Sequence, residues 1–132
     1  MGFLERLYTG NYDKLFDFNL DIIRHVVEHL DIKTRIVLLS DLGVEGKGDR
    51  LLVELCKALG ADTFLVQSAA MKYLDREIFK EAGLTLRFFR QPSPVYPQLW
   101  GDFVFNLSAL DLLLNCGPRA RNILLESKSR VS

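Results

Sequence analysis

Apolar residues follow two kinds of pattern along the chain, and their alternation predicts an α/β fold. Short apolar runs at residues 36–39 and 63–66, and an alternating run at 84–90, are typical of strands. The segments between them carry apolar residues every three or four positions, as helices with one buried face do. We therefore expect an α/β domain in three layers, with a mainly parallel sheet of at least three strands and flanking helices.

Residues 35–68 form the stretch around which we expect the rest to pack. The pattern predicts a strand at about 35–40, a glycine-rich loop, a helix capped by Asp49 and a second strand at 63–67. Functional groups in such units gather at the carboxyl ends of the strands. This places Ser40 and Asp41, at the carboxyl end of the first strand, at the expected site.

Further helices are predicted on both sides of this stretch. A short helical turn is expected within residues 1–9, and a long helix from Asn11 or Asp13 to about His29. Ser108, with Asp111 three residues later, resembles a capping box, and Gly117 is placed to end the helix that follows it. The remaining helices are expected at about residues 69–74, 75–82 and 119–125.

The glycine loop has the sequence G-V-E-G-K-G-D-R and invites comparison with phosphate-binding loops. It lacks the P-loop pattern, because Lys47 is followed by Gly48 and not by a hydroxyl residue, and it lacks the G-x-G-x-x-G spacing. Arg50 falls in the first turn of the helix, where the helix dipole disfavours a cation unless an anion is near. The loop is therefore either a phosphate or carboxylate site or a plain connector.

Composition and charge narrow the class of protein. The chain has 132 residues, and its 17 basic and 17 acidic residues balance, which argues against nucleic acid as a partner. No apolar run is long enough to span a bilayer, and the N-terminus lacks the pattern of a secretory signal. Cys56 and Cys116 have no C-x-x-C spacing, so we interpret them as reduced core residues of a cytoplasmic protein.

His25 and His29 are four residues apart and share one helix face. That spacing is able to bind a metal, but the H-E-x-x-H motif is absent and no further histidine or cysteine pair completes a site. We interpret the two histidines as structural residues at the surface or the core edge. The sequence predicts no metal site and no cofactor.

A proline-rich loop at residues 91–102 interrupts the regular pattern. It carries the aromatic residues Tyr96 and Trp100, and its prolines exclude a helix. Loops of this length in compact domains are often functional. The alternative is a rigid strap over the sheet edge with the aromatic residues packed beneath it.

The order of several short blocks resembles the WbqC-like protein family. The resembling blocks are I-V-L-L-S-D-L, D-R-L-L-V-E-L-C-K-A-L-G-A-D-T-F-L, K-Y-L-D-R-E-I-F-K-E-A-G-L-T-L-R-F, V-Y-P-Q-L-W-G-D-F and N-L-S-A-L-D-L-L-L-N-C-G. The resemblance implies a single WbqC-like domain over residues 1–132 that corresponds to the C-terminal part of a longer family. The chain departs from the family after Leu65, where it has Val66, Gln67 and Ser68 in place of small residues and glycines.

The resemblance also implies a role in bacterial surface polysaccharide, including O-antigen, as a transferase that moves a glycine or similar acyl group to a sugar or sugar nucleotide. On this reading the substrate is a sugar nucleotide or another small molecule. The candidate catalytic residues are Asp41, as a base, and Ser40. The candidate substrate-binding residues are Arg50, Tyr96, Gln98, Ser108 and Asp111.

Two other readings stay open. In the first, the chain is a non-catalytic, truncated domain that binds a partner or forms a homodimer through Trp100, Tyr96 and the sheet edge. In the second, the chain is a scaffold, and the chemistry lies elsewhere in the longer protein. Ser108 and Asp111 also have a complete structural explanation as helix-capping residues.

Overall fold

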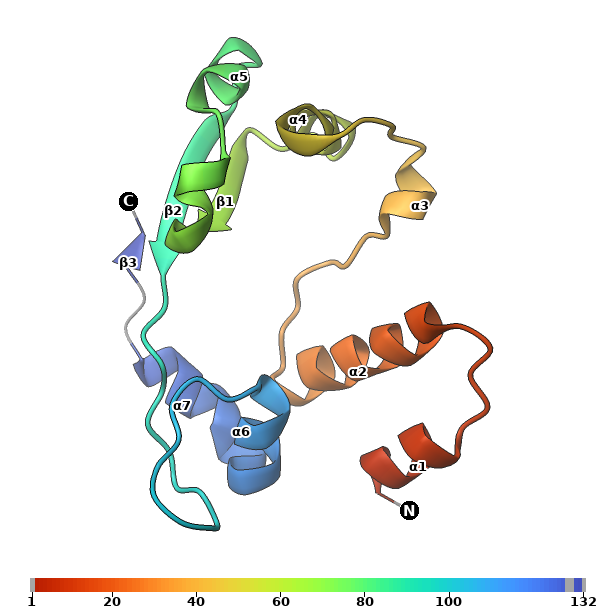
Figure 1. The fold of residues 1–132 in the computed structure, drawn as a ribbon, viewed down its shortest axis with the longest axis vertical. Helices are drawn as coiled ribbons and strands as arrows, with labels where there is room; N and C mark the ends of the chain where they lie inside the picture. The colour runs from red at the N-terminus through yellow and green to blue at the C-terminus, as the bar shows by residue number, and fades with distance from the viewer. Residues whose placement is uncertain (1, 128–129, 132) are drawn as a thin grey trace. The chain divides into compact units, whose positions relative to one another are not determined.

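The computed structural model describes residues 2–127, 130 and 131, and these form two compact units (Figure 1). The helical unit comprises residues 2–34 and 93–127, and the α/β unit comprises residues 35–92 with 130–131. The main segment of the α/β unit is thus inserted between two segments of the helical unit. The single domain over residues 1–132 stays a prediction, and each unit is described by itself.

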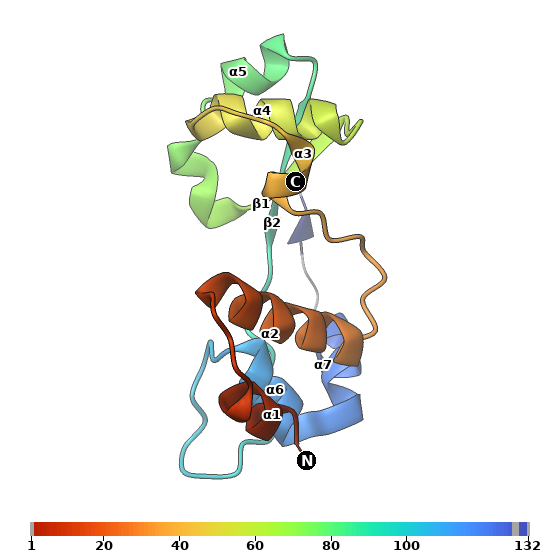
Figure 2. The ribbon, with the colours of Figure 1, turned by 90° about the vertical axis from the view of Figure 1, so that its right-hand side faces the viewer.

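Among its described residues, the helical unit contains four α-helices and one 3₁₀ turn. Figure 2 labels the helices. The helices are α1 (Phe3–Thr9), α2 (Leu15–His29), α6 (Ala109–Cys116) and α7 (Ala120–Glu126), and the turn is η2 (Gly117–Arg119). A cluster of buried side chains forms a core of this unit and consists of Leu30, Tyr96, Leu112, Cys116 and Ala120. The core therefore joins the end of α2 to α6, α7 and the loop before α6.

Helix α2 confirms the long helix predicted from the apolar spacing, but its start differs. The helix begins at Leu15, with Lys14 in the capping position and no side-chain cap, so the predicted start at Asn11 or Asp13 is wrong. At its other end, the Arg121 guanidinium donates to the carbonyl oxygens of Leu30 at 2.8 Å and Asp31 at 2.9 Å. A cation thus satisfies carbonyls that the end of a helix leaves without partners.

Helix α6 begins and ends as the sequence predicts. The Ser108 hydroxyl accepts a hydrogen bond from the backbone N–H of Leu110 at 3.2 Å, which satisfies one free donor of the first turn. Gly117 follows the helix with φ +52°, a left-handed conformation that favours glycine. Asp111 accepts instead from the hydroxyl of Tyr96, so its carboxylate is used for a tertiary contact.

The α/β unit contains a parallel pair of strands with helices packed on them. Its elements are α3 (Leu39–Leu42), α4 (Gly48–Ala58), β1 (Thr63–Gln67), η1 (Ser68–Tyr73), α5 (Arg76–Glu81), β2 (Thr85–Arg90) and β3 (Arg130–Val131). Strands β1 and β2 pair in parallel, with Thr63 opposite Thr85 and Gln67 opposite Phe89. The core of this unit consists of Val53, Cys56, Phe79 and Leu84.

Polar contacts fix the ends of these elements. Gly60, with φ +64°, follows the end of α4 as predicted. Asp49 does not cap α4; its carboxylate accepts the backbone N–H of Asp75 at 2.7 Å, which ties the start of α4 to the start of α5. The Ser68 hydroxyl donates to the Phe89 carbonyl oxygen at 2.9 Å, joining the ends of β1 and β2.

The strand predicted at residues 35–40 is wrong. Residues 32–38 form neither helix nor strand, and Leu39–Leu42 is helical. Ile36 is 45% exposed, so the apolar run is not buried on both faces as a central strand would be. Hydrophobic, β-branched composition favours a strand but does not supply the neighbouring strand whose backbone groups it needs.

The parallel part of the sheet therefore has two strands, β1 and β2. The two-residue β3 pairs antiparallel with the end of β2 and is not one of the predicted strands. The fold is a mixture of helices and strands, with a two-stranded parallel sheet and flanking helices. The prediction is more specific, since it gives three layers and a mainly parallel sheet of at least three strands. Among the described residues, no helix combines the length and the apolar character needed to cross a membrane.

Both cysteines are free and buried, as predicted. Burial raises the pKa of the Cys56 thiol above its ordinary value. A thiol with a raised pKa holds little thiolate at neutral pH, so Cys56 acts as a small apolar core residue.

Candidate functional site

The predicted site residues fall into two groups, one in each unit. The α/β unit carries Ser40, Asp41 and Arg50, and the helical unit carries Tyr96, Gln98, Ser108 and Asp111. Each group has its own geometry, and each is described within its own unit.

Ser40 and Asp41 lie on the short helix α3, and both side chains are exposed. The Ser40 hydroxyl donates to Asp41 Oδ1 at 3.2 Å. Among the ion pairs of the described residues, none involves Asp41. The pair thus presents an exposed carboxyl group with one oxygen engaged by a neighbouring hydroxyl.

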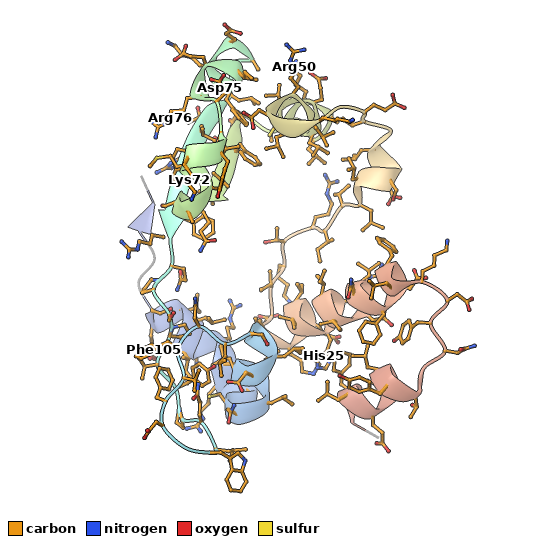
Figure 3. All side chains as sticks on the ribbon, viewed as in Figure 1. His25, Arg50, Lys72, Asp75, Arg76 and Phe105 are labelled. Carbon is orange, nitrogen blue, oxygen red and sulfur yellow. The ribbon has the colours of Figure 1, made fainter. Side chains whose placement is uncertain are left out.

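Arg50 lies on the first turn of α4, where its exposed side chain extends from the helix into solvent (Figure 3). It lines a hollow of about 540 Å³ together with Lys47 of the glycine loop. The rest of the lining is Glu45, Gly46, Val53, Glu54 and Ile78. The hollow is therefore built from the loop, the first turns of α4 and one residue of α5.

The charges around this hollow do not cancel one another in pairs. The Glu54 carboxylate accepts a hydrogen bond from the Lys57 ammonium at 2.7 Å, so a cation outside the hollow already partners it. Neither Lys47 nor Arg50 takes part in an ion pair within the part of the chain that the structure describes. Lys47 and Arg50 thus bring two cations to a hollow whose one carboxylate outside an ion pair is that of Glu45, which leaves an excess of positive charge at a helix start that suits an anion.

Tyr96 is buried, with 7% of its surface exposed. Its hydroxyl donates to Asp111 Oδ2 at 2.7 Å, and its ring packs edge-on against Phe103 with ring centroids 5.8 Å apart. Burial, and secondarily the bond to the Asp111 carboxylate, raise the pKa of Tyr96 above its ordinary value. Tyr96 is therefore a neutral donor that ties the proline-rich loop to α6.

Gln98 closes the same loop through a pair of hydrogen bonds. Its amide Nε2 donates to the Val104 carbonyl oxygen at 2.9 Å, and its Oε1 accepts the Val104 N–H at 2.9 Å. Beside this closure, Tyr96, Gln98 and Phe103 contribute to a hollow of about 430 Å³, which Val95, Pro97 and Gly101 complete. Three of the predicted binding residues, Tyr96, Gln98 and Asp111, are thus connected through one loop, while the Ser108 hydroxyl serves as the cap of α6.

The helical unit also contains a cavity that the sequence analysis did not assign. It measures about 400 Å³ and is lined by apolar side chains of α1 and α6 together with His25 and His29 of α2. The spacing of the histidines was the only signal in the sequence. It could not reveal the cavity, because the apolar lining comes from helices far apart along the chain. Within the described residues, no group of three or more histidine, cysteine or carboxylate side chains is arranged to hold a metal ion.

Comparison with known proteins assigns this chain to a protein family. A family model described as the WbqC-like protein family matches residues 1–123, which is nearly the whole chain. The chain belongs to the WbqC-like protein family. It is also 32% identical over 124 residues to the uncharacterized protein Rv1507c of Mycobacterium tuberculosis (strain ATCC 25618 / H37Rv).

The alignment with the mycobacterial protein covers different shares of the two chains. The aligned region covers 92% of the WbqC-like chain but only 52% of the mycobacterial relative, so the chain spans about half of that protein's length. No solved structure matches the chain. The resemblance predicted from the sequence blocks is therefore confirmed at the level of the family, and its assignment to the family's C-terminal part stays a prediction.

The two hollows of this WbqC-like chain offer different chemistry. The hollow at the start of α4 offers an ammonium and a guanidinium, which recognise phosphate or carboxylate groups. The hollow at the proline-rich loop offers the edge of an aromatic ring and a backbone that the Gln98 amide holds in place. These groups suit a ligand with a neutral ring.

Proposed function

We propose that this chain is part of a transferase that acts on a nucleotide-linked sugar in the synthesis of bacterial surface polysaccharide, including O-antigen. The transferred group in this proposal is a glycine or a similar acyl group. Membership of the WbqC-like family supports the assignment in general terms. The observation that carries it is the shared hollow of Lys47 and Arg50 at the start of α4.

The diphosphate of the substrate is proposed to bind in this hollow. A nucleotide sugar carries two phosphate groups, and each offers oxygens that accept from a guanidinium or an ammonium. Next to Lys47, Gly48 starts α4 in a left-handed conformation, with φ +57°, and no atom lies within 4 Å of the place that a β-carbon would take. A residue with a β-carbon would be strained at this position.

The other predicted site residues take roles consistent with their surroundings. Asp41, with Ser40 beside it, is proposed as the base that accepts a proton from the attacking hydroxyl or amine. Tyr96, Gln98, Ser108 and Asp111 are proposed to contribute to substrate binding by shaping the hollow of the proline-rich loop.

The proposal is tested by isothermal titration of the folded chain with a panel of nucleotide sugars and with inorganic pyrophosphate. We expect saturable heat with at least one nucleotide sugar and weaker heat with pyrophosphate. Arg50→Gln should reduce the affinity by roughly tenfold or more, because one charge-assisted hydrogen bond is lost.

Arg87→Gln is the matched control, because Arg87 is an exposed arginine of the same unit on β2 and does not line the hollow. It should leave the affinity unchanged. Absence of heat with every nucleotide sugar, from a chain shown to be folded by circular dichroism, would remove the proposal. An equal loss of affinity with both arginine variants would show that only non-specific charge attraction holds the ligand.

A second candidate function is a binding or dimerisation domain, and a surface of the proline-rich loop favours it. Three apolar side chains of this loop are largely exposed, Val95 at 74%, Leu99 at 77% and Trp100 at 87%. Phe105, which follows the loop and is labelled in Figure 3, is 66% exposed. Tyr96 is buried in the core and is not part of this surface. Light scattering after size-exclusion chromatography tests for a homodimer. A monomer mass at every concentration would count against dimerisation. If a dimer is found, Trp100→Ser should weaken it.

A further inference from the structure

The cavity of the helical unit is separate from both hollows considered so far. It lies among α1, α2, α6 and the turn after α6, and shares no lining residue with either hollow. Its volume of about 400 Å³ falls within the range of small-molecule sites in proteins. The lining residues are Gly2, Phe3, Leu4, His25, His29, Leu110, Leu113, Leu114, Gly117 and Pro118.

The lining favours an uncharged occupant. Apart from the two imidazoles, every described residue of the lining is apolar or glycine, and none carries a carboxylate, an ammonium or a guanidinium group. A charged ligand would lose its hydration here without gaining an ionic partner, which is costly. An apolar body, by contrast, gains from leaving water.

His29 gives this apolar cavity a directional polar group. Its Nδ1 lies 2.8 Å from the backbone carbonyl oxygen of His25. A carbonyl oxygen only accepts hydrogen bonds, so Nδ1 must carry the proton. In the neutral ring, Nε2 then holds a lone pair and acts as an acceptor.

His25 is held in place beside it. Its ring, labelled in Figure 3, belongs to α2. The ring stacks on Phe3 with centroids 3.4 Å apart and an interplanar angle of 3°, and its centroid lies 3.8 Å from that of the His29 ring. Burial, and secondarily the charge of His29, lower the pKa of His25 below its ordinary value. His25 is therefore neutral at pH 7 and adds no positive charge to the cavity.

We propose that this cavity binds a neutral small molecule with an apolar body and a hydroxyl group, and that the hydroxyl donates a hydrogen bond to His29 Nε2. The site goes beyond the proposed transferase function, because it uses none of the residues assigned to the substrate there. Its ligand class follows from the uncharged lining and from the acceptor at His29 Nε2, which the contact of Nδ1 with the His25 carbonyl creates.

The test compares benzyl alcohol with toluene, two probes that share a ring and differ in the hydroxyl. Binding is followed at pH 7.5 by the NMR shifts of the histidine rings and the leucine methyl groups. We expect both probes to saturate, with benzyl alcohol binding about threefold to tenfold more tightly, as one hydrogen bond allows. His29→Phe should abolish this difference while toluene still binds.

Two further measurements keep the proposal open to refutation. Leu114→Trp, on the lining, should block both probes, whereas Leu125→Trp should not; the two leucines are similarly exposed, at 65% and 67%, and Leu125 lies outside the lining. In the unaltered chain, long-range nitrogen–proton NMR should show His29 protonated at Nδ1. A ring protonated only at Nε2, equal binding of the two probes, or blocking by Leu125→Trp would overturn the proposal.

Discussion

The hydroxyl of Tyr96 donates a hydrogen bond of 2.7 Å to the carboxylate of Asp111, and this contact ties the proline-rich loop to helix α6. The donor is buried, and its ring also packs against the core residues of the helical unit. The loop is thus fixed at one end by a charge-assisted bond, which is stronger than a bond between neutral groups.

Removal of this hydroxyl should destabilise the helical unit. Tyr96→Phe retains the ring but leaves the Asp111 carboxylate without its donor, so we expect the free energy of unfolding to fall by about 1–2 kcal/mol. Urea unfolding followed by circular dichroism measures the change. Tyr8→Phe is the control, since Tyr8 is 79% exposed and should cost almost nothing; equal effects of the two variants would show that the bond contributes no stability.

The ionisation of His25 should depend on His29. Burial is the main reason why the pKa of His25 lies below its ordinary value of 6.5, and the charge of His29 is the second; Arg6 acts in the same direction and Glu28 in the opposite one. His29→Gln should therefore raise the pKa of His25 toward 6.5 without reaching it. NMR titration of the ring protons measures this, and Lys14→Gln, at the far end of α2, should leave the pKa of His25 unchanged.

This lowered pKa has a consequence for stability. The folded chain binds the His25 proton less tightly than the unfolded chain does, so acid favours unfolding. The contribution of neutral His25 is complete above pH 6.5 and is lost as the pH falls through the pKa of the folded state. We expect His25→Phe to reduce the fall in stability between pH 7 and pH 5, and an unchanged pH dependence would contradict this assignment.

The closure of the proline-rich loop by Gln98 should be visible in backbone hydrogen exchange. Gln98→Ala removes the acceptor of the Val104 N–H, so exchange of that amide should accelerate by roughly fivefold to tenfold. The Leu99 N–H is a control within the same loop, because it is held separately by the side chain of Asn115 at 3.1 Å. Asn115→Ala should accelerate Leu99 and leave Val104 unchanged; acceleration of both amides in both variants would mean that the loop opens as one piece.

Local signals in the sequence determined many of the elements. The apolar spacing predicts α2, and the short runs predict β1 and β2, because these patterns reflect which face of each element is buried. Ser108, Gly60 and Gly117 predict their helix ends, since a hydroxyl cap or a left-handed glycine acts within a few residues of the chain. The short blocks were also enough to indicate the WbqC-like family.

Only the tertiary structure decided where partners far apart along the chain would meet. The run at residues 36–39 has the composition of a strand but lacks a neighbouring strand, so it forms none. Asp49 and Asp111 look like caps, yet their carboxylates accept from Asp75 and from Tyr96. The cavity beside His29 likewise depends on residues of α1, α2 and α6, and the sequence does not specify that packing through any local pattern, because burial and hydrogen bonding between distant segments are properties of the folded chain.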